Sequence, residues 1–153
     1  MSPRLFIYSL PLFLVALYAC NNDPVFSVVP AIEFVDIQPR VVRQFTDSMV
    51  ITVRFTDGDG DLGDQGAEKN MVIVDQRSTL TPEQATIEYT VPNLTPDARN
   101  PSIQGLIYIE VAPTAITPGR NVPSEQTHFS IRLFDRAGHA SNVVLTDEIT
   151  ILR

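Results

Sequence analysis

The chain has 153 residues, a formal net charge of −7 and a single cysteine. Because acidic side chains outnumber basic ones and no run of lysine or arginine occurs, the composition argues against nucleic acid as a partner. It also leaves no basic patch that would bind anionic lipid head groups. With one cysteine there is no internal disulfide, so a domain of this length must be stabilised by its apolar core.

An apolar N-terminal stretch ends at the cysteine. Residues 5–19 are uncharged and follow Arg4, which is the order of a secretory signal peptide. The stretch is shorter than the roughly 20 residues that a membrane-spanning helix needs. We therefore expect residues 1–19 to be removed on export, which leaves a mature chain with a net charge of −8.

The end of this stretch, Leu17-Tyr18-Ala19-Cys20, resembles the lipobox of bacterial lipoproteins. That resemblance implies acylation of Cys20, and several acyl chains hold a protein stably on a membrane. The alternative is a plain signal peptide, or a short anchor, with an unrelated cysteine. Residues 20–31 contain two prolines and no clear period, so we expect a tether that links the lipidated cysteine to the domain. Asn21 and Asn22 favour the outer membrane over retention in the inner one.

Short apolar runs separated by turn residues predict a domain over residues 32–153 with about seven strands. Alternation is clearest over residues 51–56 and 129–133, where one face of each strand is expected to be buried. The fold class is therefore all-β, an antiparallel sandwich. The runs are 32–37, 49–55, 71–74, 86–91, 106–111, 129–134 and 143–152.

Helix signals are confined to one place. The sequence Thr81-Pro82-Glu83-Gln84 has a capping residue, a first-turn proline and a glutamine at the third helical position, which predicts a single helical turn. The proline-rich stretches 92–101 and 113–123 are expected to be loops between strands.

An acidic, glycine-rich stretch follows the strand that ends at Phe55. In TDGDGDLGDQGAE, from Thr56 to Glu68, carboxylates alternate with glycines, and such an arrangement can converge hard oxygen ligands on one calcium ion. The spacing matches an EF-hand in part, but Leu62 stands where glycine is needed and a strand, not a helix, precedes the loop. The competing interpretation is a solvated turn that binds no metal.

A second aspartate has similar surroundings. Asp57 comes two residues after Phe55 and Asp135 two residues after Leu133, so each is expected to point to the same, buried face as the apolar residues of its strand. Both carboxylates are therefore expected at the rim of the core. A carboxylate there needs a cation or several donors. Arg136 is a candidate to neutralise an aspartate without metal.

The motifs FTDGDGDLG and FDRAGHASN together resemble Ig-like β-sandwich domains of lipid-anchored proteins from Gram-negative bacteria. The Ig-like topology that this resemblance implies places the loops after the second and sixth strands at one end, so Asp57 and Asp135 would be neighbours. Our hypothesis is one calcium ion bound by a single set of carboxylates, Asp57, Asp59, Asp61, Asp64 and Asp135.

Other residues offer little chemistry. His128 and His139 lack the companions of a zinc site and are interpreted as surface residues. Neither a nucleophile elbow nor a phosphate-binding loop occurs. Tyr89 shares the parity of its apolar neighbours and is expected in the core, whereas Tyr108 is expected to face outward.

These observations favour a non-enzymatic, lipid-anchored binding or spacer module of the cell envelope. The sequence does not identify its partner, a protein or a glycan. One alternative is an accessory subunit or metal-assisted hydrolase of an envelope carbohydrate-handling complex. Another is assembly with a further envelope protein by strand addition at a sheet edge.

Overall fold

The structure is a computed structural model that describes residues 26–64, 66, 68–95, 102–112 and 122–153. Cys20, the proposed signal peptide and most of both proline-rich loops lie outside the described residues. Within them, ten strands and one helical turn are formed. Their bounds are β1 Ala31–Gln38, β2 Val41–Arg43, β3 Met49–Asp57, β4 Met71–Asp75, α1 Pro82–Ala85, β5 Thr86–Tyr89, β6 Ile103–Val111, β7 Ser124–Thr127, β8 Phe129–Leu133, β9 Val144–Leu145 and β10 Ile149–Leu152.

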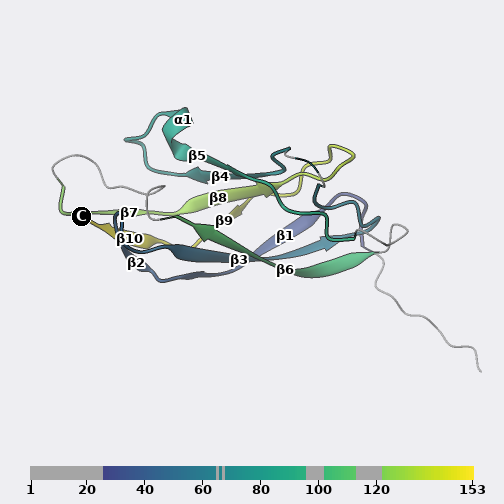
Figure 1. Cartoon of the computed structure of the whole chain (residues 1–153), viewed down its shortest axis with the longest axis horizontal. Helices are drawn as coiled ribbons and strands as arrows, with labels where there is room; N and C mark the ends of the chain where they lie inside the picture. The colour runs from purple at the N-terminus through teal and green to yellow at the C-terminus, as the bar shows by residue number, and fades with distance from the viewer. Residues whose placement is uncertain (1–25, 65, 67, 96–101, 113–121) are drawn as a thin grey trace, which may run out of the picture.

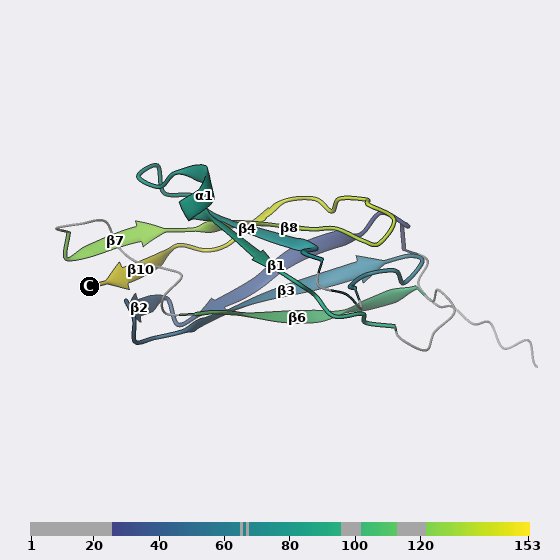
Figure 2. The same ribbon diagram turned by 45° about the horizontal axis from the view of Figure 1, so that its top comes forward.

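Two antiparallel sheets face each other across the core (Figures 1 and 2). One has the strand order β1-β3-β6 and the other β5-β4-β8-β9. A third sheet, β2-β10-β7, lies at the end that carries the C-terminus, and its β2–β10 pair is parallel. The architecture is all-β and compatible with the expected Ig-like sandwich.

Alternating side chains build the core. In β3, Ile51, Val53 and Phe55 are buried while Arg54 on the other face is exposed. The same alternation in β4 and β8 buries residues of the opposite sheet, and the two inner faces pack together. The largest fully buried side chains are Phe129, Ile37, Met49, Ile51, Leu62, Met71, Ile73, Ile131, Leu133, Ile149, Ile151 and Val53.

Each of the seven predicted runs contains a strand, but the last run is divided. β9 pairs with β8 in one sheet, and after Thr146 the chain crosses to the third sheet, where β10 pairs with β7 and β2. Thr146 marks the crossing point because its side chain accepts the Phe129 backbone N–H at 3.0 Å. β2 and β7 were not predicted, since their short sequences show little apolar alternation.

The predicted helical turn is confirmed as α1. Thr81 caps it, and the Thr81 and Gln84 side chains each accept the other residue's backbone N–H, at 3.4 and 3.1 Å. Across the described part of the chain, no helix has the length and apolarity needed to cross a lipid bilayer.

The direction of each strand determines at which end of the sandwich the loop that follows it lies. β3 and β8 both end where the isolated bridge between Leu62 and Asp135 forms, so the loops that follow them meet there. We call this the acidic end. β4 is antiparallel to β8 and therefore ends at the opposite end, near β7.

Candidate metal centre

Asp57 is the last residue of β3 and keeps the inward orientation of its strand. Its exposed fraction is 0%, although its side chain is a carboxylate. Asp59 and Asp61 follow in the loop and are partly buried. The expectation that Asp57 shares the buried face of its strand and lies at the edge of the core is confirmed.

Two loop residues explain the path of the chain beyond β3. Gly63 has φ of 82°, a left-handed conformation that glycine adopts without strain, and a Cβ there would lie 2.0 Å from the Pro92 carbonyl oxygen. Leu62, beside it, is completely buried in the core. Leu62, which departs from the EF-hand pattern, therefore anchors this loop to the sandwich. We call residues 58–64 the acidic loop.

The loop brings three carboxylates together. One oxygen each from Asp57, Asp59 and Asp61 lies within 4.8 Å of the others, a spacing that could hold a metal ion. Four oxygens of this group are shielded from water and accept no hydrogen bond from another group of the described structure. They are both oxygens of Asp57, Oδ1 of Asp59 and Oδ1 of Asp61.

This arrangement costs free energy without a cation. Burial raises the pKa of Asp57, the charges of Asp59 and Asp61 raise it further, and the nearby Asp61 backbone N–H offsets only part of the effect. Burial likewise raises the pKa of Asp61, with Asp135 and Asp59 adding to it. Because each negative charge disfavours ionisation of the neighbouring carboxyl groups, this group of carboxylates favours the binding of either protons or a cation.

Asp135 is a close neighbour of this group, as expected, but its oxygens are engaged elsewhere. The His139 backbone N–H donates to Oδ1 at 2.7 Å, and His139 Nδ1 lies 2.8 Å from Oδ2. His139 is an exposed residue, as predicted, yet its contact with Asp135 was missed. The four-residue spacing across the Ala137-Gly138 turn is the signal that would have found it.

Asp64 is held by its backbone. Its N–H donates to the Val91 carbonyl at 2.9 Å and its carbonyl accepts the Asn93 N–H at 3.0 Å. Among the described residues, the group of mutually close carboxylates contains neither Asp64 nor Asp135. Of the five ligands hypothesised, the structure thus brings three together.

Arg136 contacts the loop without pairing with an aspartate. Its Nη1 donates to the Gly63 carbonyl at 3.1 Å and to Asn93 Oδ1 at 3.2 Å. No ion pair of Arg136 with an acidic side chain occurs among the described residues. Its positive charge lowers the pKa of Asp61 by less than burial and the charges of Asp135 and Asp59 raise it. Arg136 therefore braces the loop without forming an ion pair with any of the three carboxylates.

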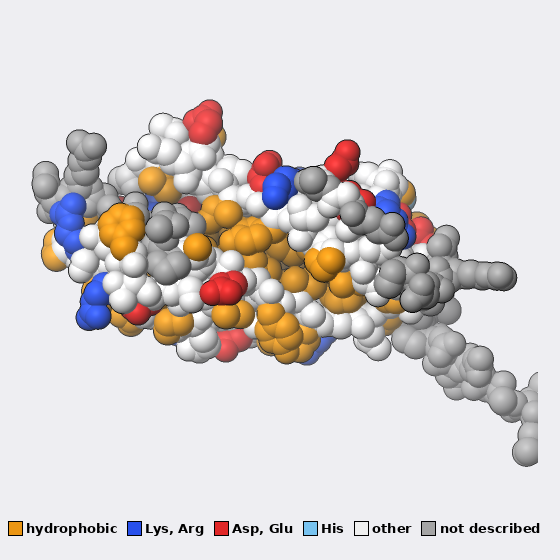
Figure 3. Space-filling view, in the orientation of Figure 1, with side chains coloured by type: hydrophobic (Ala, Val, Ile, Leu, Met, Phe, Trp, Pro, Cys, Tyr) orange, Lys and Arg blue, Asp and Glu red, His pale blue; other side chains and the backbone are white. Residues whose placement is uncertain are grey.

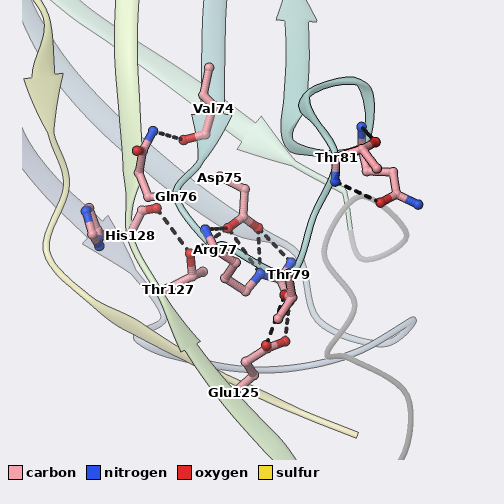
Figure 4. Close-up of polar contacts among 10 residues, drawn as sticks. Val74, Asp75, Gln76, Arg77, Thr79, Thr81, Glu125, Thr127 and His128 are labelled. Atoms are coloured by element: carbon pink, nitrogen blue, oxygen red, sulfur yellow. Dashed lines mark hydrogen bonds and ion pairs between the residues drawn. The ribbon is translucent and has the colours of Figure 1, made fainter.

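A second buried aspartate, at the opposite end, shows a satisfied arrangement (Figure 4). Asp75 lies 2.7 Å from Arg77 Nη2 and accepts the Thr127 hydroxyl at 2.6 Å, while Arg77 Nη1 contacts Glu125 at 2.8 Å. Sequence reasoning missed this cluster. The parity rule used for Asp57 also applies to Asp75, which continues Met71 and Ile73 and would have drawn attention to it.

Between the edges of the two sheets runs an apolar groove of about 290 Å³. Figure 3 shows apolar side chains gathered along the middle of this face. Tyr89 is half-buried against the core and its hydroxyl donates to the Glu110 carbonyl at 3.1 Å, whereas Tyr108 is 67% exposed. Both tyrosines thus face as predicted, and Tyr89 joins the two sheets across the groove.

Comparison with known proteins assigns this chain to no family. Neither a protein-family model nor a curated protein matches this sequence. Among solved structures, the chain is similar to a Niemann-Pick type C2 protein from the Japanese carpenter ant, with a TM-score of 0.41 and 7% sequence identity. The match covers 80% of this chain and 92% of the ant protein.

Proposed function

We propose that this protein is a lipid-anchored module of the bacterial outer membrane, with a non-enzymatic binding or spacer role and a calcium ion bound at its acidic end. The anchor is the acylated Cys20, and the proposal of export and acylation is supported by the signal pattern and the lipobox-like tetrapeptide. A β-sandwich suits this role because its end loops and sheet edges serve recognition.

The calcium ion is inferred from the chemistry of the three carboxylates. All available ligands are hard oxygens, which calcium takes in sets of six to eight at about 2.3–2.6 Å. Magnesium retains several waters in most protein sites. Because the four unpaired oxygens are shielded from water, they favour an ion coordinated largely by protein, and calcium fits that requirement better.

The same shielding favours a stabilising ion over a catalytic one. A metal-assisted hydrolase needs an open coordination position that substrate or an activated water can occupy. The single observation that carries the calcium proposal is that Asp57 is fully buried and that neither of its carboxylate oxygens accepts a hydrogen bond in the described part of the chain. Asp75 is also buried, but Arg77 and Thr127 donate to its carboxylate, so it shows what a metal-independent buried aspartate looks like in this protein.

Calorimetry on the mature protein in detergent, stripped with EGTA, tests the calcium site. We expect one calcium per chain and a rise in melting temperature, both strongly reduced in Asp57→Asn and Asp61→Asn. Asp64→Asn is the matched control, because it removes a carboxylate of the same loop that lies outside the group. Absence of heat and of any thermal shift at millimolar calcium would end the proposal.

The anchor is tested separately, by growth with labelled palmitate and fractionation of the envelope. We expect label on the wild-type protein, a processed mass that begins at Cys20, and recovery with outer membranes. Cys20→Ala should carry no label. An unlabelled wild-type protein whose first 19 residues are still present contradicts the proposed anchor, whatever the calorimetry gives.

A further inference from the structure

The described chain begins with a short segment that lies on the acidic loop. The Gly58 backbone N–H donates to the Ser27 carbonyl at 2.8 Å, and the Phe26 N–H reaches Ser102 Oγ at 3.5 Å. A Cβ at Gly58 would lie 2.4 Å from the Phe26 carbonyl oxygen, so the two backbones are in direct contact. We call residues 26–29 the entry segment, because they come before Pro30 and β1.

The entry segment has few other attachments. Val28 and Val29 are 52% and 43% exposed, and the Val29 N–H is bonded within the segment, to Ser27 Oγ. Regular pairing with β3 begins only at Ala31, opposite Thr56. The Gly58–Ser27 hydrogen bond is therefore the segment's main link to the sandwich among the contacts described here.

The Gly58–Ser27 hydrogen bond lies directly beside the three carboxylates. Gly58 stands between Asp57 and Asp59, two of the three carboxylates that lie within 4.8 Å. Holding these side chains around one ion fixes the backbone between them and with it the direction of the Gly58 N–H. Without a cation the carboxylates repel each other, which favours a loop that opens and turns this N–H away from Ser27.

We propose that calcium binding at Asp57, Asp59 and Asp61 clamps the entry segment to the sandwich and so sets the length of the free tether. This inference rests on the proposed calcium site and the proposed anchor. With the clamp closed, seven residue steps lead from Cys20 to Ser27, the residue held by Gly58, which gives a reach of about 24 Å. With it open, the free chain extends to β1 and its reach approaches about 37 Å.

Hydrogen exchange on the mature lipidated protein in detergent micelles, titrated with calcium, tests the clamp. We expect exchange of the Gly58 amide, which donates the hydrogen bond to Ser27, to slow at least tenfold on calcium binding. Peptides covering β4 and the Asp75–Arg77 end should change little. The calcium concentration at half-protection should equal the dissociation constant from calorimetry.

Two variants make the test decisive. Asp61→Asn should shift the half-protection concentration and the dissociation constant by the same factor. Gly58→Ala should leave the amide at position 58 fast-exchanging at saturating calcium, because its Cβ displaces the Phe26 carbonyl and breaks the hydrogen bond to Ser27. Calcium binding to the wild type without slower exchange at Gly58 overturns the clamp alone, as does a calcium-bound Gly58→Ala protein whose amide at position 58 remains protected. Absence of calcium binding to the wild type overturns the calcium site itself.

Discussion

Arg77 and Asp75 form an ion pair of 2.7 Å in which both side chains are only 5% exposed. Glu125 contacts a second nitrogen of the same guanidinium, and Thr127 donates to the same carboxylate. The pKa of Arg77 is raised by its hydrogen bonds to Asp75 and Glu125 in spite of its burial. The buried Asp75 at the far end of the sandwich is thus paired with an arginine, whereas Asp57, Asp59 and Asp61 at the acidic end form no ion pair among the described residues.

The first prediction concerns this pair. Arg77→Met leaves Asp75 and Glu125 without their partner in a buried setting, so the free energy of unfolding should fall by about 3–5 kcal/mol. Urea denaturation at saturating calcium measures it. Arg54→Met is the matched control, because it removes the exposed pair with Glu33 and should cost less than about 1 kcal/mol. Equal losses in the two variants would show that burial does not govern the Arg77 pair.

Asp57→Asn should have opposite effects with and without calcium. In EGTA the variant removes a buried, unpaired charge, so its melting temperature should exceed that of the wild type by about 4 °C. At saturating calcium the order should reverse, because the wild type gains binding free energy that the variant lacks. Differential scanning calorimetry in both buffers checks this, and a variant that is less stable in both contradicts the assignment of Asp57 as a calcium ligand.

In the calcium-free protein, the stability contributed by Asp57 and Asp61 should fall as pH rises. Burial and neighbouring carboxylates raise the pKa of Asp57 and Asp61 above the ordinary value of 3.8, so the folded state binds more protons there than the unfolded state. Their contribution to stability is fully present below pH 3.8 and is lost as pH rises through the folded pKa.

Because other groups titrate in the same range, the difference between wild type and Asp57→Asn isolates this contribution. In EGTA the wild type should lose stability relative to the variant as pH rises from about 4 to about 7. Urea denaturation along this series measures the difference. A difference that stays constant with pH would show that the pKa of Asp57 is the same in the folded and unfolded states.

Leu62→Ala tests whether the acidic loop depends on its core contact. The side chain is completely buried, so its truncation should lower the free energy of unfolding by about 2–5 kcal/mol and weaken calcium binding by loosening the loop. Leu145→Ala, at a side chain 57% exposed, is the control and should leave both nearly unchanged. Tighter calcium binding in Leu62→Ala would contradict the role of Leu62 as the anchor of the loop.

Local sequence was sufficient to predict most of the sandwich and the burial of Asp57. A strand turns successive side chains to opposite faces, so the orientation of Asp57 and Asp135 follows from their own neighbours. The capped helical turn at Thr81 was equally readable, because all the residues of a capping box lie within four positions.

Tertiary structure decided which charges meet. Asp135 reaches the acidic end as expected, but there it binds His139. Asp64, whose backbone is hydrogen-bonded to Val91 and Asn93, lies outside the group of three close carboxylates. Arg77 finds Glu125 across 48 residues of sequence. Hydrogen bonds and ion pairs act over about 3 Å, so side-chain pairing depends on where distant segments come together, which the two-residue period of a strand does not specify.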